Sequence, residues 1–170
     1  MQRSSTMSPG LELNLHLPDE EATQRCGAAL APALVGGMVV TLLGDLGAGK
    51  TTLVRGLLRA RGVTGPVKSP SYGLVEHYPI SSLYFYHIDF YRFADPAEWE
   101  TAGLAECFRS DSVCLVEWPE RVAGLLPVPD LALELAYVSQ GIGRELRARA
   151  FTAAGERCLN ALADGMQALR

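Results

Sequence analysis

Residues 44–56, which read GDLGAGKTTLVRG, carry the clearest chemical signal in this sequence of 170 residues. Gly44, Gly49, Lys50 and Thr51 occupy the fixed positions of the pattern G-x-x-x-x-G-K-S/T, which binds nucleotide phosphates. Its glycines let backbone N–H groups surround phosphate oxygens, and the following helix N-terminus adds a positive partial charge. The pattern predicts a bound nucleotide. It leaves open whether that nucleotide is hydrolysed, donates a phosphate to a substrate or acts as a switch.

Two side chains of this phosphate loop have distinct expected tasks. Lys50 is expected to neutralise the β- and γ-phosphates, and the Thr51 hydroxyl is expected to serve as a ligand for magnesium. Lysine occurs elsewhere only at Lys68, whereas the chain has 13 arginines. A residue type that is rare in the chain but present at the required position strengthens the assignment.

Magnesium also needs oxygen ligands from outside the loop, commonly an acid at the end of a neighbouring buried strand. The strings YFYHIDF and VCLVEW offer Asp89 and Glu117, each at the point where an apolar run ends. Ligands gather at such strand ends in an open α/β sheet. One acid is expected to hold magnesium and the other to orient water, but spacing alone does not decide which does which.

Three further residues near these acids have two readings each. Ser71, in KSPSYGLV, could meet the γ-phosphate or magnesium as a switch residue, or could simply fill a turn. His87 shares a strand face with Asp89 and could touch the site, but we expect it to be a hydrogen-bonded structural histidine. Arg92 could pair with phosphate or Asp89, or form a surface salt bridge.

Sequence motifs and net charge narrow the identity of the nucleotide base and the classes of binding partner. Small GTPases recognise guanine through an N-K-x-D segment, and neither Asn14 nor Asn160 is followed by lysine, so ATP is favoured over GTP. The net charge of -4 argues against direct binding of DNA or other nucleic acid, which usually needs a basic face. The only local basic cluster, formed by Arg144, Arg147 and Arg149, is expected to be a solvated strand face.

Hydrophobic periodicity predicts an α/β fold in which helices flank a central, mostly parallel sheet with antiparallel hairpins. Strands are expected at 11–17, 36–44 and 112–118, and hairpins at 72–78 with 82–91 and at 130–138 with 144–151. Helices are expected at 18–34, with Asp19 as N-cap, and at 50–61, 95–108, 119–126 and 153–169.

The remaining features predict a cytoplasmic protein that does not enter a membrane. Residues 1–10 are expected to be a disordered tail, and residues 11–170 a single domain. No apolar run approaches the roughly 20 residues needed to cross a bilayer. The four cysteines show no metal-binding or disulfide spacing and are expected to be small buried hydrophobic residues.

Several strings together closely resemble the TsaE (YjeE) family, the bacterial ATPases of tRNA threonylcarbamoyladenosine synthesis. The resemblance extends from about residue 18 to about residue 137 and is carried by GDLGAGKTTLVRG, VKSPSYGLVEHY, YHIDFYRFADPAEWE and CLVEWPER. It implies a P-loop NTPase fold and a role beside the proteins TsaB and TsaD. In that system TsaD modifies adenosine 37 of tRNA, and ATP hydrolysis by TsaE sustains the cycle, so tRNA is an indirect partner.

The resemblance also implies roles for individual residues. ATP or ADP would contact the loop residues Asp45, Leu46, Gly47, Ala48, Gly49, Lys50, Thr51 and Thr52, with Asp19 and Thr23 on the base side. Thr51, Glu117 and Asp89 would serve magnesium, and Lys50, Asp89 and Glu117 would serve hydrolysis. Trp118 matches the family's E-W pair. Where the family usually has S-P-T, this chain has Ser71, which keeps the hydroxyl but loses the methyl group that restricts its rotamer.

Two other classes of function use the same loop. A small-molecule kinase needs an acceptor site and usually an arginine-bearing lid, which the spread of arginines does not indicate. A non-catalytic nucleotide switch would need fewer acids than Asp89 and Glu117 together. An ATPase whose slow hydrolysis matters within a complex is therefore the favoured hypothesis.

Overall fold

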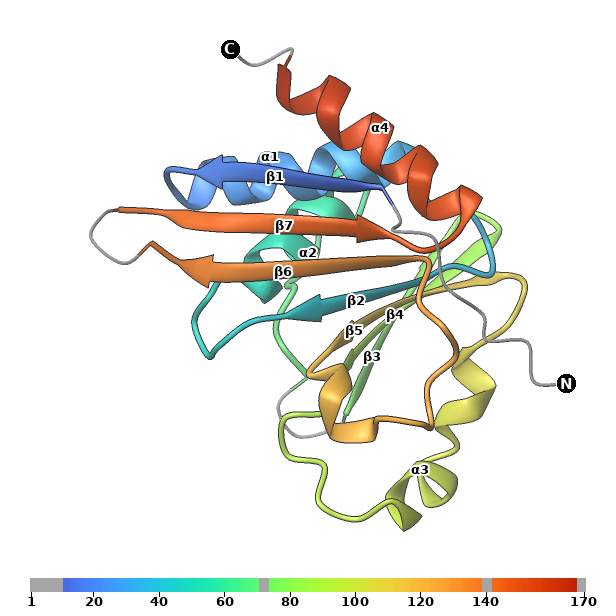
Figure 1. Ribbon diagram of the computed structural model, residues 1–170. Helices are drawn as coiled ribbons and strands as arrows, with labels where there is room; N and C mark the ends of the chain where they lie inside the picture. The colour runs from blue at the N-terminus through green and yellow to red at the C-terminus, as the bar shows by residue number, and fades with distance from the viewer. Residues whose placement is uncertain (1–10, 71–73, 139–141, 168–170) are drawn as a thin grey trace, which may run out of the picture.

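A seven-stranded sheet forms the centre of the computed structural model, which describes residues 11–70, 74–138 and 142–167 (Figure 1). Across the sheet the strand order is β1-β7-β6-β2-β5-β4-β3. In chain order the strands are β1 (Glu12–Leu17), β2 (Val39–Leu43), β3 (Val75–Ile80), β4 (Leu83–Asp89), β5 (Ser112–Glu117), β6 (Leu131–Tyr137) and β7 (Arg144–Ala150).

The four inner strands β6, β2, β5 and β4 are parallel, and antiparallel pairs lie outside them. The hairpins β3–β4 and β6–β7 and the pairing of β1 with β7 are antiparallel, which confirms the predicted mixed sheet. Register brings the two candidate acids together, because Glu117 lies opposite Asp89 on one side and Leu42 of β2 on the other. Glu117 therefore stands beside the strand that leads into the phosphate loop, and Asp89 stands one strand further along the sheet.

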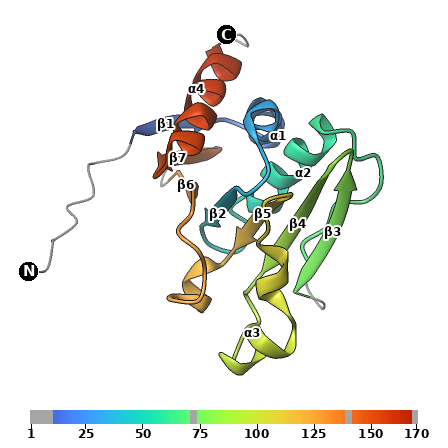
Figure 2. The ribbon, with the colours of Figure 1, turned by 90° about the vertical axis from the view of Figure 1, so that its right-hand side faces the viewer.

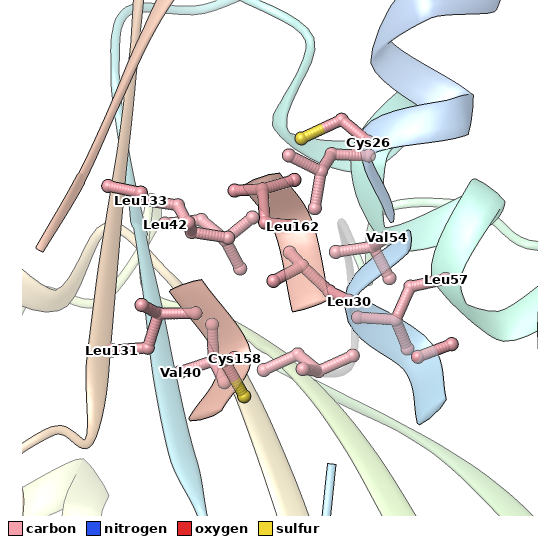
Figure 3. Packing of buried hydrophobic residues seen from close by; sticks show 14 of the residues in the cluster. Cys26, Leu30, Val40, Leu42, Val54, Leu57, Leu131, Leu133, Cys158 and Leu162 are labelled. Atoms are coloured by element: carbon pink, nitrogen blue, oxygen red, sulfur yellow. The ribbon is translucent and has the colours of Figure 1, made fainter. Parts of the chain in front are cut away.

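Three helices cover one face of the sheet, as the two views in Figure 1 and Figure 2 show. They are α1 (Glu20–Leu30), α2 (Lys50–Ala60) and α4 (Ala153–Gln167), and α1 packs against both of the others. Figure 3 shows the core between these helices and strands β2 and β6, filled by Cys26, Leu30, Val40, Leu42, Val54, Leu57, Leu131, Leu133, Cys158 and Leu162. The predicted closing helix thus packs on the body of the protein.

The opposite face of the sheet carries a second, smaller core. Alternate residues of the same strands point there, so Val39 and Val116 join this cluster while Val40 and Leu115 belong to the first. The short helix α3 (Ala97–Thr101) and the 3₁₀ turns η2 (Leu104–Cys107) and η3 (Pro119–Val122) lie on this side (Figure 2). A further 3₁₀ turn, η1 (Ala31–Ala33), which contains Pro32, follows α1, so the helix predicted over 18–34 ends earlier than expected.

The predicted helix over 95–108 is wrong in extent. The Asp95 carboxylate accepts a hydrogen bond from the backbone N–H of Ala97 at 2.9 Å, which fits a helix start. However, Gly103 adopts a φ of +65°, a left-handed conformation that an α-helix cannot continue through, and only a 3₁₀ turn follows. The helix predicted over 119–126 is likewise only a 3₁₀ turn.

The predictions for the cysteines are confirmed for three of the four. All four cysteines are free, and Cys26, Cys114 and Cys158 are buried as expected, whereas Cys107 is only partly buried. Burial raises the pKa of the Cys26 thiol to about 12, so it behaves as a small apolar group. None of the helices in the described ranges has the length and hydropathy needed to cross a membrane. Residues 1–10, predicted to be disordered, lie outside the described residues.

Candidate functional site

The phosphate loop connects the carboxyl end of β2 to the first turn of α2, as the motif requires. Gly44, Gly47 and Gly49 have φ values of +142°, +76° and +106°, which favour glycine over other residues. At Gly44 space is also limiting, since a Cβ atom would lie 2.4 Å from the carbonyl oxygen of Leu135. The glycines of the motif are therefore needed for the backbone path of the loop.

Lys50 is held inside the loop with its ammonium group at the site. Its Nζ donates to the carbonyl oxygens of Gly44 and Asp45, the latter at 3.3 Å, and lies 4.0 Å from the centre of the Trp118 ring. The residue is only 5% exposed. Burial lowers the pKa of the Lys50 ammonium, and the negative charges of Glu117 and Asp89 oppose this effect. The cation is thus poorly solvated and suited to an anionic ligand.

Glu117 is the centre of a hydrogen-bonded chain across three elements. The Thr51 hydroxyl donates to Glu117 Oε2 at 3.1 Å, and His87 Nε2 lies 2.5 Å from the same oxygen. Glu117 is 2% exposed and His87 is 0% exposed. His87 Nδ1 has no hydrogen-bond partner among the described residues, which favours the tautomer that carries its proton on Nε2. His87 is a hydrogen-bonded buried histidine, as expected, and its partner is a candidate site residue.

Asp89 is held in a different way. The Ser69 hydroxyl donates to Asp89 Oδ2 at 2.5 Å, and the backbone N–H of Tyr91 donates to Oδ1 at 2.8 Å. Both carboxylate oxygens therefore have a fixed donor. Ser69 begins the S-P-S segment in which Ser71 was a candidate ligand, but Ser71 itself lies outside the described residues. Sequence reasoning missed Ser69, although its place in the same segment was a usable signal.

These groups surround one hollow of about 290 Å³ beside the phosphate loop, which we call the phosphate hollow. Its lining joins loop backbone, a lysine, hydroxyls and acids from four segments of the chain: Leu46, Gly47, Gly49, Lys50, Thr51, Thr52, Ser69, Asp89, Glu117 and Trp118. Asp45 is absent from this lining, and its exposed side chain leaves only its carbonyl oxygen in contact with Lys50.

The oxygen donors in this hollow fit a magnesium ion only in part. The Thr51 hydroxyl and the Glu117 carboxylate are hard oxygen ligands of the kind that magnesium takes. Among the residues that the structure describes, no three His, Cys, Asp or Glu side chains gather closely enough to hold a metal. A magnesium ion here would need further oxygens from nucleotide phosphates and water, which is the usual arrangement in nucleotide sites.

A second hollow, of about 450 Å³, lies on the other side of the same loop. We call it the base-side hollow, after the residues predicted to lie there. Its lining includes the predicted base-side residues Asp19 and Thr23, and it shares Gly47, Gly49 and Thr52 with the first hollow. Asp19 also caps α1, as predicted, because its Oδ1 accepts a hydrogen bond from the backbone N–H of residue 22 at 2.7 Å. Ala48 completes the loop's contribution to this lining.

The prediction for Arg144 is wrong. Instead of being part of a solvated strand face, Arg144 lines the base-side hollow and donates hydrogen bonds to carbonyl oxygens of the phosphate loop. Arg147 fits the expectation, since it forms a half-exposed ion pair with Glu12. The difference follows from position: Arg144 begins β7 next to the loop, whereas the side chain of Arg147, farther along the same strand, reaches Glu12 of the edge strand β1.

A third hollow, of about 480 Å³, adjoins the first through the shared residues Leu46, Ser69 and Asp89. Its other lining residues come from the segment before β3, the end of β4 and the α3 region: Pro70, Leu74, Tyr91, Arg92 and Glu98. Asp89 therefore stands between the phosphate side and a separate open space. Sequence reasoning gave no sign of this space.

Comparison with known proteins gives a consistent result. The family described as threonylcarbamoyl adenosine biosynthesis protein TsaE matches residues 17–146. A TsaE protein of Haemophilus influenzae is 41% identical over 157 residues, covering 89% of this chain and 98% of the relative. A TsaE protein of Bacillus subtilis is 37% identical over 146 residues, covering 86% of this chain and 89% of the relative.

A solved structure agrees with these sequence matches. The crystal structure of YdiB from Bacillus subtilis superposes with a TM-score of 0.77 at 30% sequence identity. The similarity covers 91% of this chain and 96% of that one. The likeness therefore extends over the whole fold rather than over the phosphate loop alone.

Proposed function

Because this chain belongs to the TsaE family, we propose that it is the ATP-hydrolysing subunit of tRNA threonylcarbamoyladenosine biosynthesis. In this proposal residues 11–170 act as one cytoplasmic ATPase domain that binds ATP with magnesium. Hydrolysis is slow in the isolated protein and is stimulated by TsaB and TsaD, so tRNA is involved only through those partners.

One observation carries the proposal: Lys50, Thr51, Glu117 and Asp89 converge on a single hollow beside the phosphate loop. A loop that merely binds phosphate does not require two acids from neighbouring strands. Hydrolysis does, because one oxygen ligand must hold the metal ion while another group orients the attacking water.

The geometry supports a division of roles between the acids. Glu117 accepts a hydrogen bond from the Thr51 hydroxyl and so stands on the metal side of the hollow. Asp89 instead accepts hydrogen bonds from the Ser69 hydroxyl and the Tyr91 N–H, and it borders the open third hollow. We therefore assign Glu117 to magnesium and Asp89 to the water.

In the resulting mechanism the chain supplies positioning and charge. Lys50 and the inward N–H groups of the loop stabilise negative charge on the γ-phosphate, and Asp89 aligns a water with the phosphorus. Ser69 and the Tyr91 N–H hold the Asp89 carboxylate while it does so. A magnesium ion held by Thr51 and Glu117 would neutralise part of the phosphate charge.

A small-molecule kinase is the second candidate, and the third hollow favours it. A phosphate acceptor would need space next to Asp89, and this hollow of about 480 Å³ provides it. The two candidates differ in what activates phosphate transfer. A kinase responds to an acceptor molecule, whereas the proposed ATPase responds to TsaB and TsaD.

The direct test is formation of threonylcarbamoyladenosine on tRNA over many turnovers by TsaB and TsaD, with and without this chain. We expect continued product formation with the wild-type chain and an early stop with Asp89→Asn. The control is Asp111→Asn, which changes an exposed acid beside the opposite end of β5 and should behave as wild type. Sustained product formation without the chain, or with Asp89→Asn, would contradict the proposal.

A further inference from the structure

The β6–β7 hairpin donates hydrogen bonds to three successive carbonyl groups of the phosphate loop. The Tyr137 hydroxyl, at the end of β6, donates to the carbonyl oxygen of Leu46 at 2.9 Å. Arg144, at the start of β7, donates from Nη2 to the carbonyl of Gly47 and from Nε to that of Ala48, each at 3.2 Å. These contacts join segments about 90 residues apart in the chain.

The two side chains also hold each other. Tyr137 and Arg144 are direct partners in the β6–β7 ladder, and the guanidinium carbon lies 4.1 Å from the centre of the tyrosine ring. The third guanidinium nitrogen, Nη1, donates to the carbonyl of Gly143 at 2.9 Å. Each nitrogen of Arg144 is thus committed to a carbonyl oxygen, which fixes the orientation of the guanidinium group.

Because the peptide group is rigid, these contacts to carbonyl oxygens also set the direction of the N–H groups of the phosphate loop. The described backbone has no cis peptide bonds, and in a trans peptide the C=O and N–H groups point in opposite directions. Holding the carbonyls of residues 46 and 48 outward therefore turns the N–H groups of Gly47 and Gly49 toward the other side. Both glycines line the phosphate hollow. Because glycine has a wide choice of conformations, such a loop gains order from external restraint.

We propose that Tyr137 and Arg144 form a latch that sets the phosphate loop in its binding conformation before any nucleotide arrives. Arg144 is in this account a positioning residue that acts through the loop backbone and not by contacting phosphate. The proposal rests on the proposed function in one respect, namely that the loop binds nucleotide phosphates. It adds that the affinity of the loop depends on a hairpin remote in sequence.

The test compares the nucleotide-free proteins by amide hydrogen exchange measured by NMR. The reporters are the N–H groups of Ala48 and Leu53, which donate to Asp45 O at 3.1 Å and Gly49 O at 3.0 Å. We expect both to exchange faster in Tyr137→Phe, which keeps the ring and removes the donor, and faster still in Arg144→Ala. The matched control is Arg147→Ala, an arginine of the same strand that pairs with Glu12.

Binding of inorganic tripolyphosphate and of ATP is then measured by calorimetry on the same variants. Arg144→Ala should weaken both by about tenfold, since the loss of one or two hydrogen bonds from a charged donor is of this order. Arg144→Lys should not restore the wild-type affinity, because a lysine lacks the planar fork that reaches two carbonyls. A loss for ATP alone, with tripolyphosphate unaffected, would mean that Arg144 contacts the base or ribose and would overturn the latch.

The exchange data decide the remaining outcomes. Unchanged exchange at Ala48 and Leu53 in both latch variants would overturn the proposal whatever the affinity. If Arg144→Ala speeds exchange throughout β7, the conservative Tyr137→Phe variant decides: faster loop exchange supports the latch, and wild-type exchange rejects it. If the wild-type chain fails to bind ATP, the proposed function fails, while the loop exchange still reports on the latch.

Discussion

On one side of the phosphate loop, Asp89 and Glu117 stand at the ends of neighbouring parallel strands, whereas the other side takes its groups from unrelated segments. The base side is formed by the first turn of α1 around Asp19 and by the β6–β7 hairpin around Arg144. The acids of the phosphate side are placed by the register of the sheet. The residues of the base side are placed by a helix cap and by hydrogen bonds to backbone.

Individual side chains on the two sides also differ in exposure. On the phosphate side Glu117 and its partner His87 are almost entirely buried, whereas on the base side Asp19 is exposed, although Thr23 is buried. Buried polar groups lose more when a partner is removed, because water cannot replace it. Substitutions of these buried groups on the phosphate side should therefore have large effects on function and stability, and substitution of the exposed Asp19 on the base side should have a small one.

The largest effect is expected for Lys50→Ala. Removing the Lys50 ammonium group from the phosphate hollow should lower kcat/KM for ATP hydrolysis by about 100- to 1000-fold, the range seen when a donor to developing charge is lost. ATP binding, measured by calorimetry, should weaken as well. The control Lys68→Ala removes the other lysine, which is exposed. Unchanged ATP affinity and turnover in Lys50→Ala would contradict the role of this lysine.

Glu117→Gln should have the next largest effect, and it should depend on magnesium. Loss of a carboxylate ligand is expected to weaken the apparent affinity for magnesium about 10- to 100-fold, as changes around metal ligands do. ATP binding with magnesium should therefore fall, while binding in the presence of a chelator should change little. An equal loss under both conditions would show that Glu117 supports the fold of the loop and not the metal ion.

A smaller effect, on stability, is expected for His87→Phe. The substitution leaves the buried Glu117 carboxylate without one of its two side-chain donors, which should cost about 1–3 kcal/mol of the free energy of unfolding. Urea denaturation of His87→Phe and of the control His77→Phe, at an exposed position on β3, measures this difference. Equal stability of the two variants would mean that the His87–Glu117 contact contributes nothing to the fold.

The smallest effect is expected on the base side, for Asp19→Ala. Loss of the N-cap of α1 should lower the free energy of unfolding by about 1 kcal/mol. ATP affinity should change only slightly, because the cap sits at the open base-side hollow and not at the phosphates. A loss of affinity as large as that of Lys50→Ala would remove the contrast between the two sides.

The same contrast explains what could be predicted from sequence. Lys50 and Thr51 belong to a local motif, and Asp89 and Glu117 end apolar strands, so both signals lie within a few neighbouring residues. The positions of the strands along the chain and their grouping into hairpins followed from periodicity in the same way, whereas their order across the sheet did not. The extent of the helix after Asp95 did not, because the left-handed Gly103 interrupts a pattern that otherwise favours a helix.

Contacts between segments distant in the chain gave no comparable signal in the sequence. Arg144 reaches the phosphate loop because it stands at the first position of β7, opposite the last residue of β6. Nothing near Arg144 in the sequence distinguishes it from Arg147. The contact of Ser69 with Asp89 likewise depends on how the segment before β3 folds back over the end of β4. Such pairings are properties of the assembled fold.

The most direct test of the central claim is phosphate release from ATP by the purified chain, alone and after addition of TsaB and TsaD. We predict slow release alone and a rise of at least about tenfold with the pair, as for nucleotide hydrolases completed by a partner. Lys50→Ala should show no rise. Release that the pair leaves unchanged, but that a small nucleoside or sugar acceptor switches on, would contradict the account and favour the kinase.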